Sequence, residues 1–200
     1  RHDYDTSSVR WMIFSQVTPA PFHETRTVFP NAQLIEGYGL TETTNGLTYL
    51  DMAHMLEKQG SAGRPLHGVD IRIVDEDDEE VPAGTAGEVV VRSAKVCDGY
   101  LDDPDATARA FRGGWFHTGH VGRLDGDGYL HIRGRLKDMI RSGGENVASS
   151  EIEAVVYEVE GVHEAAAIGV PHAKWVEVPA VFVVAADGAR IDPADVIAHC

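Results

Sequence analysis

The sequence has only two cysteines and no long hydrophobic run, and both absences narrow the class of protein. Cys97 and Cys200 lack the CxxC or Cys/His spacing of zinc sites, so we expect inert thiols and no disulfide framework. No stretch approaches the roughly 20 apolar residues of a bilayer span, and residues 1–10 lack the apolar core of a signal peptide. The sequence therefore predicts a globular, cytoplasmic protein with at most peripheral membrane contact.

Basic residues are also scarce. The chain has 17 Lys and Arg against 32 Asp and Glu, for a formal net charge of −15. A field of this sign repels nucleic acid and anionic lipid, so we expect no nucleic-acid partner. The most acidic stretch, DEDDEE at Asp75 to Glu80, follows an alternating strand and precedes a Pro/Gly turn. We interpret it as a solvated hairpin tip and not as a metal site.

The 200 residues, 43% of them hydrophobic, divide into three regions with different hydrophobic patterns, which together predict a mixed α+β fold. Residues 1–59 read as part of an α/β subdomain, with strands at 11–14 and 33–36, a helix ending near residue 29 and a loop at 37–45. Residues 60–136 read as an antiparallel, β-barrel-like subdomain with short alternating runs. Residues 137–200 read as a small, truncated α+β carboxyl-terminal domain.

Three helix starts are marked by capping residues. Asp103 is expected to cap a helix with Pro104 at its first position, and Asp192 precedes the last helix. Ser150 and Glu153 have the spacing of a capping box. The last helix reaches Cys200 after about two turns without a capping signal, from which we expect a truncated chain.

The loop EGYGLTETT at 36–44 has groups suited to a nucleotide. Tyr38 offers an aromatic face for a base, Gly39 lets the backbone approach closely, Thr41 offers a hydroxyl to a phosphate oxygen, and Glu42 is a hard oxygen ligand for Mg²⁺. Short Gly/Thr motifs also recur by chance, so an ordinary polar turn remains the alternative for this segment taken alone.

A second, longer segment at 115–147 makes a resemblance to a known family clear when it is taken together with the other motifs. YGLTETT is followed in order by GSAGRPLHGVDIRIVD, GEVVVRS, GY at 99–100, WFHTGH, GYLHIRGRLKDMI, SGGENV and EIEAVV. This order of motifs resembles that of the acyl-adenylate-forming superfamily over nearly the whole chain. The residues of the WFHTG and RLKDMI motifs are most similar to those of fatty-acid:CoA ligases. The resemblance implies that a fatty acid or other carboxylic acid reacts with ATP to an acyl adenylate, and that the thiol of coenzyme A then displaces AMP.

The resemblance also implies roles for particular residues. Tyr38 would line the adenine site, Gly39 would belong to the ATP/AMP site, Thr41 would touch the α-phosphate, and Glu42 would hold Mg²⁺. His120 and Arg135 would lie at the ribose, and Lys137 would be the hinge of a mobile carboxyl-terminal domain. The turn Ser142, Gly143, Gly144 and Glu145 would line the coenzyme A channel; an ordinary turn before a helix is the alternative.

The chain departs from the family pattern at several positions. His120 stands where the family has an aspartate that accepts from both ribose hydroxyls, so we expect weak ATP binding. An HxxH metal pair, His117 and His120, is an alternative without a third ligand at convincing spacing. Ser15, Gln16 and Val17 replace a glycine-rich turn, and Val176 replaces a glycine near the coenzyme A entrance.

The phosphate loop expected before residue 1 and the catalytic lysine expected after residue 200 are not in the sequence. We therefore expect a missing amino-terminal segment and a nearly inactive isolated chain. Two alternatives stay open at this point: a non-catalytic remnant serving as an interaction scaffold, and an acyl-AMP ligase that loads a carrier protein.

Overall fold

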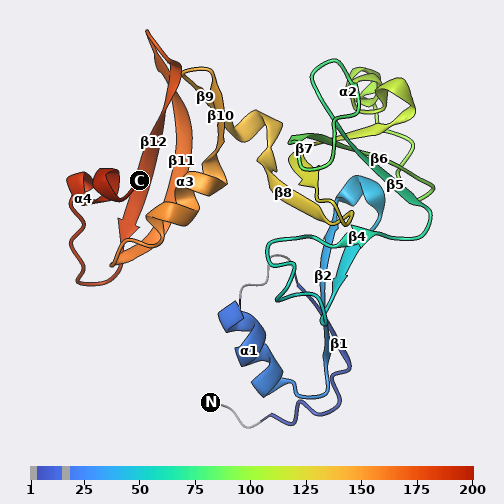
Figure 1. Ribbon diagram of the computed structural model, residues 1–200, viewed down its shortest axis with the longest axis horizontal. Helices are drawn as coiled ribbons and strands as arrows, with labels where there is room; N and C mark the ends of the chain where they lie inside the picture. Colours follow the sequence, from blue (N-terminus) through green and yellow to red (C-terminus); the bar gives the residue numbers. More distant parts are fainter. Residues whose placement is uncertain (1–3, 15–18) are drawn as a thin grey trace. The chain divides into compact units, whose positions relative to one another are not determined.

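The computed structural model describes residues 4–14 and 19–200, which divide into two compact units, Arg1–Ile132 and Arg133–Cys200. The described residues form four α-helices and three four-stranded sheets, two in the first unit and one in the second (Figure 1). The mixed α+β class expected from the sequence is confirmed. The division into 1–59, 60–136 and 137–200 stays a prediction, and the boundary between the compact units lies within β8 (Leu130–Arg135).

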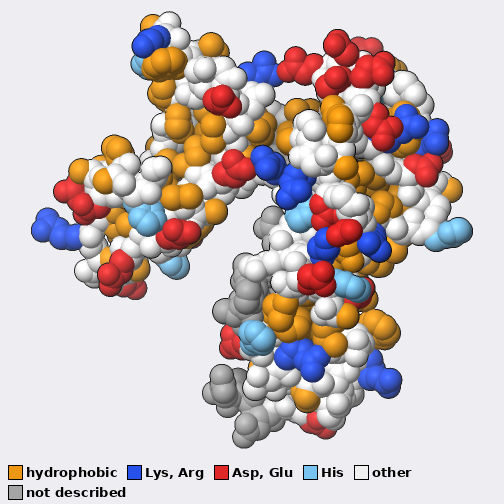
Figure 2. Space-filling view, in the orientation of Figure 1, with side chains coloured by type: hydrophobic (Ala, Val, Ile, Leu, Met, Phe, Trp, Pro, Cys, Tyr) orange, Lys and Arg blue, Asp and Glu red, His pale blue; other side chains and the backbone are white. Residues whose placement is uncertain are grey.

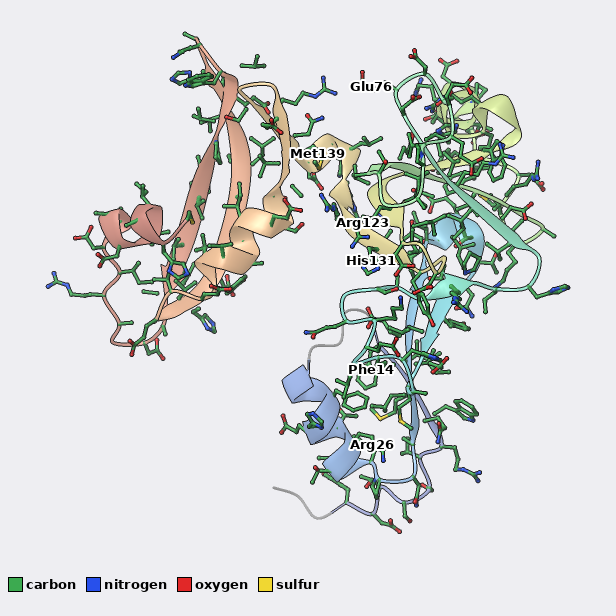
Figure 3. The ribbon with its side chains drawn as sticks, in the orientation of Figure 1. Phe14, Arg26, Glu76, Arg123, His131 and Met139 are labelled. Carbon is green, nitrogen blue, oxygen red and sulfur yellow. The ribbon has the colours of Figure 1, made fainter. Side chains whose placement is uncertain are left out.

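The first sheet has the order β1-β2-β3-β4. β1 (Trp11–Phe14) and β2 (Gln33–Gly39) are parallel, whereas β3 (Gly46–Asp51) and β4 (Arg64–Pro65) extend the sheet antiparallel. Helix α1 (Pro19–Val28) contributes Phe22 to a core that includes Leu34 and Leu50, at most 1% exposed. Phe14, labelled in Figure 3, packs against this core. β3 is a strand that the sequence did not reveal.

The second sheet has the order β5-β6-β7-β8 and is open, so the described residues form no closed barrel. β5 (Val69–Val74), β6 (Gly87–Ser93) and β7 (Phe116–Leu124) are antiparallel, and Val89, Val90 and Val91 of β6 are at most 1% exposed. The antiparallel sheet expected from the alternating runs is present, and alternation by itself does not decide whether such a sheet closes into a barrel.

Helix α2 (Pro104–Ala110) begins as predicted, because the Asp103 carboxylate accepts a hydrogen bond from the N–H of Ala106 at 2.9 Å. Short 3₁₀ turns η1 (Thr41–Thr43) and η2 (Arg112–Gly114) precede β3 and β7. The DEDDEE stretch forms the exposed tip between β5 and β6, as expected. Figure 2 shows acidic side chains gathered there, and Glu76 is labelled in Figure 3.

The second unit contains the sheet β10-β9-β12-β11. A hairpin of β9 (Met139–Ser142) and β10 (Glu145–Ala148) leads into α3 (Ser149–Val156). A longer hairpin of β11 (Val162–His172) and β12 (Val176–Ala185) precedes α4 (Pro193–His199). None of the helices in the described part of the chain is long and apolar enough to span a bilayer.

The capping box expected at Ser150 and Glu153 was wrong. The helix begins at Ser149 with Ala148 as its N-cap, two residues earlier than a Ser150 cap requires. The Ser150 hydroxyl donates instead to the carbonyl of Arg133 at 2.6 Å, and the Glu153 carboxylate accepts from the N–H of Ala167 at 2.9 Å. Both side chains thus bond to backbone groups distant in sequence and not to the backbone at the start of their own helix. The predicted helix start at Asp192 and Pro193 is confirmed for α4, and the Asp192 carboxylate accepts a hydrogen bond from the N–H of Ala194.

Candidate functional site

The end of β2 brings Tyr38 and Gly39 to the turn that carries Thr41 and Glu42. β2 and β3 pair as far as Gly39 and Gly46, with an irregularity after Tyr38. A Cβ at Gly39 would lie 2.5 Å from the carbonyl oxygen of Asn45, so the close approach of these two backbones requires glycine. The structure thus gives Gly39 a role within the chain, and its predicted close approach to a nucleotide stays a prediction.

Tyr38 and His120 lie together, although they are 82 positions apart in sequence. The Tyr38 hydroxyl is 2.9 Å from His120 Nδ1, and the two ring centroids are 5.6 Å apart. Burial raises the pKa of Tyr38 to about 12, against a lowering by the hydrogen bond with Thr118 and with a further rise from the Glu42 charge. The phenol therefore keeps its proton at neutral pH. His120 at this position bonds to the aromatic residue of the first motif.

The Glu42 carboxylate is held by a residue from outside its own motif. Tyr100 donates its hydroxyl to Glu42 Oε1 at 2.9 Å, and the N–H of Cys97 donates to the Glu42 carbonyl at 2.7 Å. In the part of the chain that the structure describes, Glu42 Oε2 has no hydrogen-bond partner. One carboxylate oxygen is thus fixed and the other open, an arrangement that fits a hard divalent cation.

The two threonines of the turn have different surroundings. Thr43 is fully buried, and its hydroxyl accepts from the N–H of Leu40 at 3.0 Å while donating to the Leu40 carbonyl at 2.9 Å. Thr41 is exposed, and among the described residues its hydroxyl has no bonding partner. Thr43 therefore shapes the turn, whereas Thr41 presents a hydroxyl to solvent, as a phosphate-binding group must.

His117 belongs to an ion-pair cluster that holds the first residues of β7. Its Nδ1 lies 2.9 Å from Glu88 Oε2, and Arg112 bonds both to Glu88 at 3.3 Å and to Asp78 at 2.9 Å. The other Glu88 oxygen accepts from the N–H of Gly119 at 3.0 Å. Asp78, Glu88 and His117 have the spacing of metal ligands, but the Arg112 guanidinium already neutralises both carboxylates. The cluster therefore positions the His117–His120 segment of β7.

Arg135 and Lys137 belong to the second unit. Arg135 ends β8 and is exposed, and Lys137 lies exposed within the 3₁₀ turn η3 (Leu136–Asp138), which contains no buried residue. Short 3₁₀ turns are frequent connectors, and η3 connects β8 to β9. The role of Lys137 as a hinge and that of Arg135 at the ribose stay predictions.

The SGGE segment is the turn of the β9–β10 hairpin, with φ of 62° at Gly143 and 92° at Gly144. Positive φ at both central positions is the geometry that selects glycine in two-residue hairpins. The N–H of Gly143 donates to the carbonyl of Trp175 at 3.1 Å, and Val176 pairs with Ser142. The glycine turn and the Trp175–Val176 tip therefore form one feature of the second unit, where the sequence placed the coenzyme A entrance.

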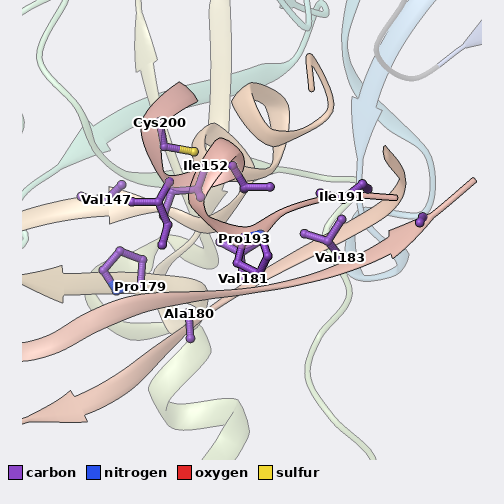
Figure 4. Close-up of a pocket in the computed structure, with 12 residues that line it drawn as sticks. Val147, Ile152, Pro179, Ala180, Val181, Val183, Ile191, Pro193 and Cys200 are labelled. Atoms are coloured by element: carbon purple, nitrogen blue, oxygen red, sulfur yellow. The ribbon is translucent and has the colours of Figure 1, made fainter. Parts of the chain in front are cut away.

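A cavity of about 810 Å³ also lies in the second unit, between β12 and the helices α3 and α4 (Figure 4). Its lining is apolar and includes Ile152, Val181 and Val196. It contains none of the side chains to which the motifs assign chemistry, and it is not part of the candidate site.

Tyr100 is the site residue that reasoning from sequence missed. It was visible only as part of the GY pair at 99–100, without a role. The replacement of a glycine-rich turn was predicted at Ser15, Gln16 and Val17, which lie outside the described residues.

Known proteins resemble this chain over most of its length. Residues 1–101 match the AMP-binding enzyme family and residues 151–200 match the AMP-binding enzyme C-terminal domain. The chain therefore belongs to the AMP-binding enzymes, which confirms the resemblance drawn from its motifs.

Two curated relatives and one solved structure illustrate the similarity. A feruloyl-CoA synthase from an Amycolatopsis species is 44% identical over 194 residues, 97% of this chain and 40% of the relative. A long-chain-fatty-acid–CoA ligase from Mycobacterium tuberculosis is 44% identical over 170 residues, 85% of this chain and 33% of the relative. The o-succinylbenzoate coenzyme A synthetase from Bacillus subtilis, in complex with ATP and magnesium ion, has a TM-score of 0.83 at 28% identity, covering 95% of this chain and 38% of that one. This chain thus spans about two fifths or less of these proteins.

Proposed function

We propose that this chain is part of an ATP-dependent acyl-CoA synthetase, which joins a carboxylic acid to coenzyme A through an acyl adenylate. The observation that carries the proposal is the grouping of Tyr38, Glu42 and His120 in the first unit. An aromatic ring, a carboxylate with one open oxygen and an imidazole lie around one turn. The ATP and magnesium ion bound by the B. subtilis relative support the same ligands here.

The proposed reaction has two displacements. In the first, a carboxylate oxygen attacks the α-phosphorus of ATP and pyrophosphate leaves. In the second, the thiol of coenzyme A attacks the acyl carbonyl, AMP leaves, and the thiol proton passes to solvent. A magnesium ion held by Glu42 would neutralise phosphate charge. Tyr38 would orient the adenine, and the exposed Thr41 hydroxyl would donate to an α-phosphate oxygen.

The second displacement is assigned to the second unit. Lys137 in η3 would be the pivot between the two half-reactions, and Arg135 would reach the ribose from the adjoining strand. The Ser142–Glu145 turn would admit the pantetheine arm, because its two glycines leave the backbone uncovered by side chains. We propose a fatty acid as the substrate, supported by the mycobacterial relative; ferulate, the acid of the Amycolatopsis relative, is the competitor to test.

The proposal is tested by nucleotide binding and by ATP/pyrophosphate exchange. Isothermal titration of the 200-residue chain with ATP should show weak binding that magnesium strengthens. Glu42→Gln should remove this magnesium dependence, and Glu57→Gln, at an exposed carboxylate of the same unit, should leave it unchanged. His120→Asp should tighten ATP binding by about tenfold, because a carboxylate accepts from both ribose hydroxyls. Exchange should rise when an upstream segment with a phosphate loop is supplied, and more with fatty acids than with ferulate.

Three results would count against the proposal. Absence of ATP binding by both the wild-type chain and His120→Asp would contradict the nucleotide site. Equal effects of Glu42→Gln and Glu57→Gln would contradict the magnesium assignment. Exchange with ferulate alone would replace the fatty acid as the proposed substrate.

A further inference from the structure

The segment 95–100 is fastened to the Glu42 turn by backbone contacts. The N–H of Cys97 donates to the Glu42 carbonyl at 2.7 Å, and the Thr44 hydroxyl donates to the Lys95 carbonyl at 2.9 Å. These bonds join two parts of the first unit that lie more than fifty positions apart in sequence. The carbonyl of Glu42 and its carboxylate are therefore both reached from the same neighbouring segment.

Tyr100 itself is fixed by the first turn of α2. Its N–H donates to the Thr107 hydroxyl at 2.9 Å, and that hydroxyl donates to the Asp103 carbonyl at 2.9 Å. Gly99, with φ of 151°, lies against Thr107, where a Cβ would be 2.6 Å from the methyl group. The backbone of Tyr100 is thus held on one side, and its hydroxyl is directed to Glu42 on the other.

The contact with Glu42 is made through one carboxylate oxygen. Tyr100 donates its hydroxyl to Oε1 at 2.9 Å, while Oε2 has no hydrogen-bond partner among the described residues. A carboxylate ligand whose rotamer is fixed in advance loses less conformational freedom when it binds a cation.

We propose that Tyr100 is a positioning residue for Glu42, holding Oε1 so that Oε2 is left to bind the magnesium ion that accompanies the nucleotide. The inference rests on the proposed function, because it gives Glu42 a metal. It assigns to the GY pair at 99–100 a part in metal binding, and it makes α2, through Thr107, the support of that site.

The test measures ATP binding by calorimetry at a series of magnesium concentrations. The binding of AMP without magnesium is the second readout. In Tyr100→Phe, the magnesium concentration that gives half of the maximal increase in ATP affinity should rise about tenfold, as is typical when a partner of a metal ligand is removed. AMP binding and the melting temperature should stay close to wild type, since Phe keeps the ring. Tyr49→Phe, at a tyrosine of the same unit that does not bond to Glu42, should change neither.

A matched pair at Thr107 tests the support independently of the phenol. Thr107→Ser keeps the hydroxyl that receives the Tyr100 N–H, whereas the isosteric Thr107→Val removes it. We expect Val to raise the magnesium requirement and Ser to leave it unchanged. This pair also keeps the inference testable should Tyr100→Phe fail to fold.

The outcomes separate this inference from the proposed function. If Glu42→Gln removes the magnesium dependence but Tyr100→Phe and Thr107→Val leave it at the wild-type value, Tyr100 has no positioning role and the inference is overturned alone. If Glu42→Gln leaves the dependence intact, or if no nucleotide binds, the metal assignment falls and takes the inference with it. Equal losses of AMP and MgATP binding in Tyr100→Phe would show a merely structural role and would also overturn it.

Discussion

The two units present their candidate groups by different means. In the first unit, Tyr38 and Glu42 are each held by a side chain from a distant segment, His120 and Tyr100 respectively. In the second, the Gly143–Gly144 turn has positive φ at both residues, and the N–H of Gly143 bonds to the backbone carbonyl of Trp175. The first site is therefore held by side chains from distant segments, and the second by backbone conformation and backbone hydrogen bonds.

This difference shows where each site is vulnerable. A change near β2 should act through packing between segments, whereas a change at the β9–β10 turn or the adjoining tip should act through backbone strain. Substitutions chosen for one mechanism in each unit make the contrast measurable.

Gly39→Ala should have the largest effect, because it forces a Cβ to within 2.5 Å of the Asn45 carbonyl oxygen. Overpacking of this kind costs about 2 to 3 kcal/mol. We expect a loss of that size in the free energy of unfolding of the first unit, measured by urea denaturation, together with weaker ATP binding. Gly126→Ala is the control, since a Cβ there meets nothing within 4 Å. Equal effects of the two substitutions would contradict the close approach at Gly39.

Much of the fold followed from local signals. β1 and β5 have the predicted bounds, and the Asp103 cap and the helix start at Asp192 are confirmed, because each depends on residues within a few positions. The prediction failed where distant partners compete. Ser150 satisfies the Arg133 carbonyl instead of its own helix. The same reasoning explains Tyr100, whose partner lies 58 positions away and leaves no periodic trace in the sequence.

Asp125 tests a second distant contact in the first unit. Burial opposes its ionisation, but hydrogen bonds from the N–H groups of Tyr129 and Asp127, the Lys58 ammonium and His131 (Figure 3) outweigh burial and lower the pKa to about 2. A lowered pKa stabilises the fold above the unfolded value near 3.9, and this contribution is lost as pH falls through about 2. The Asp125 carboxylate therefore stabilises the first unit at neutral pH.

Asp125→Asn should reduce the free energy of unfolding by about 2 kcal/mol at neutral pH. The difference between wild type and variant should become smaller at acid pH, where Asp125 is protonated. Urea denaturation at a series of pH values measures it. Asp187→Asn, at an exposed Asp-Gly turn of the second unit, should have little effect at any pH. A loss at Asp125 that does not change between neutral and strongly acid pH would show that packing, and not charge, holds this contact.

Val176 offers the smallest predicted effect, and one of opposite sign. Its φ is 70°, a conformation that a β-branched residue adopts at a cost, and its side chain is 72% exposed and so gains little from burial. Val176→Gly removes the strain but adds freedom to the unfolded chain, for a net gain of about 1 kcal/mol in the second unit. Val184→Gly, also on β12 and also exposed, should destabilise, because its backbone is not in the left-handed region. If both substitutions destabilise, the left-handed backbone at Val176 stores no strain, and the second unit is governed by tertiary contacts as the first is.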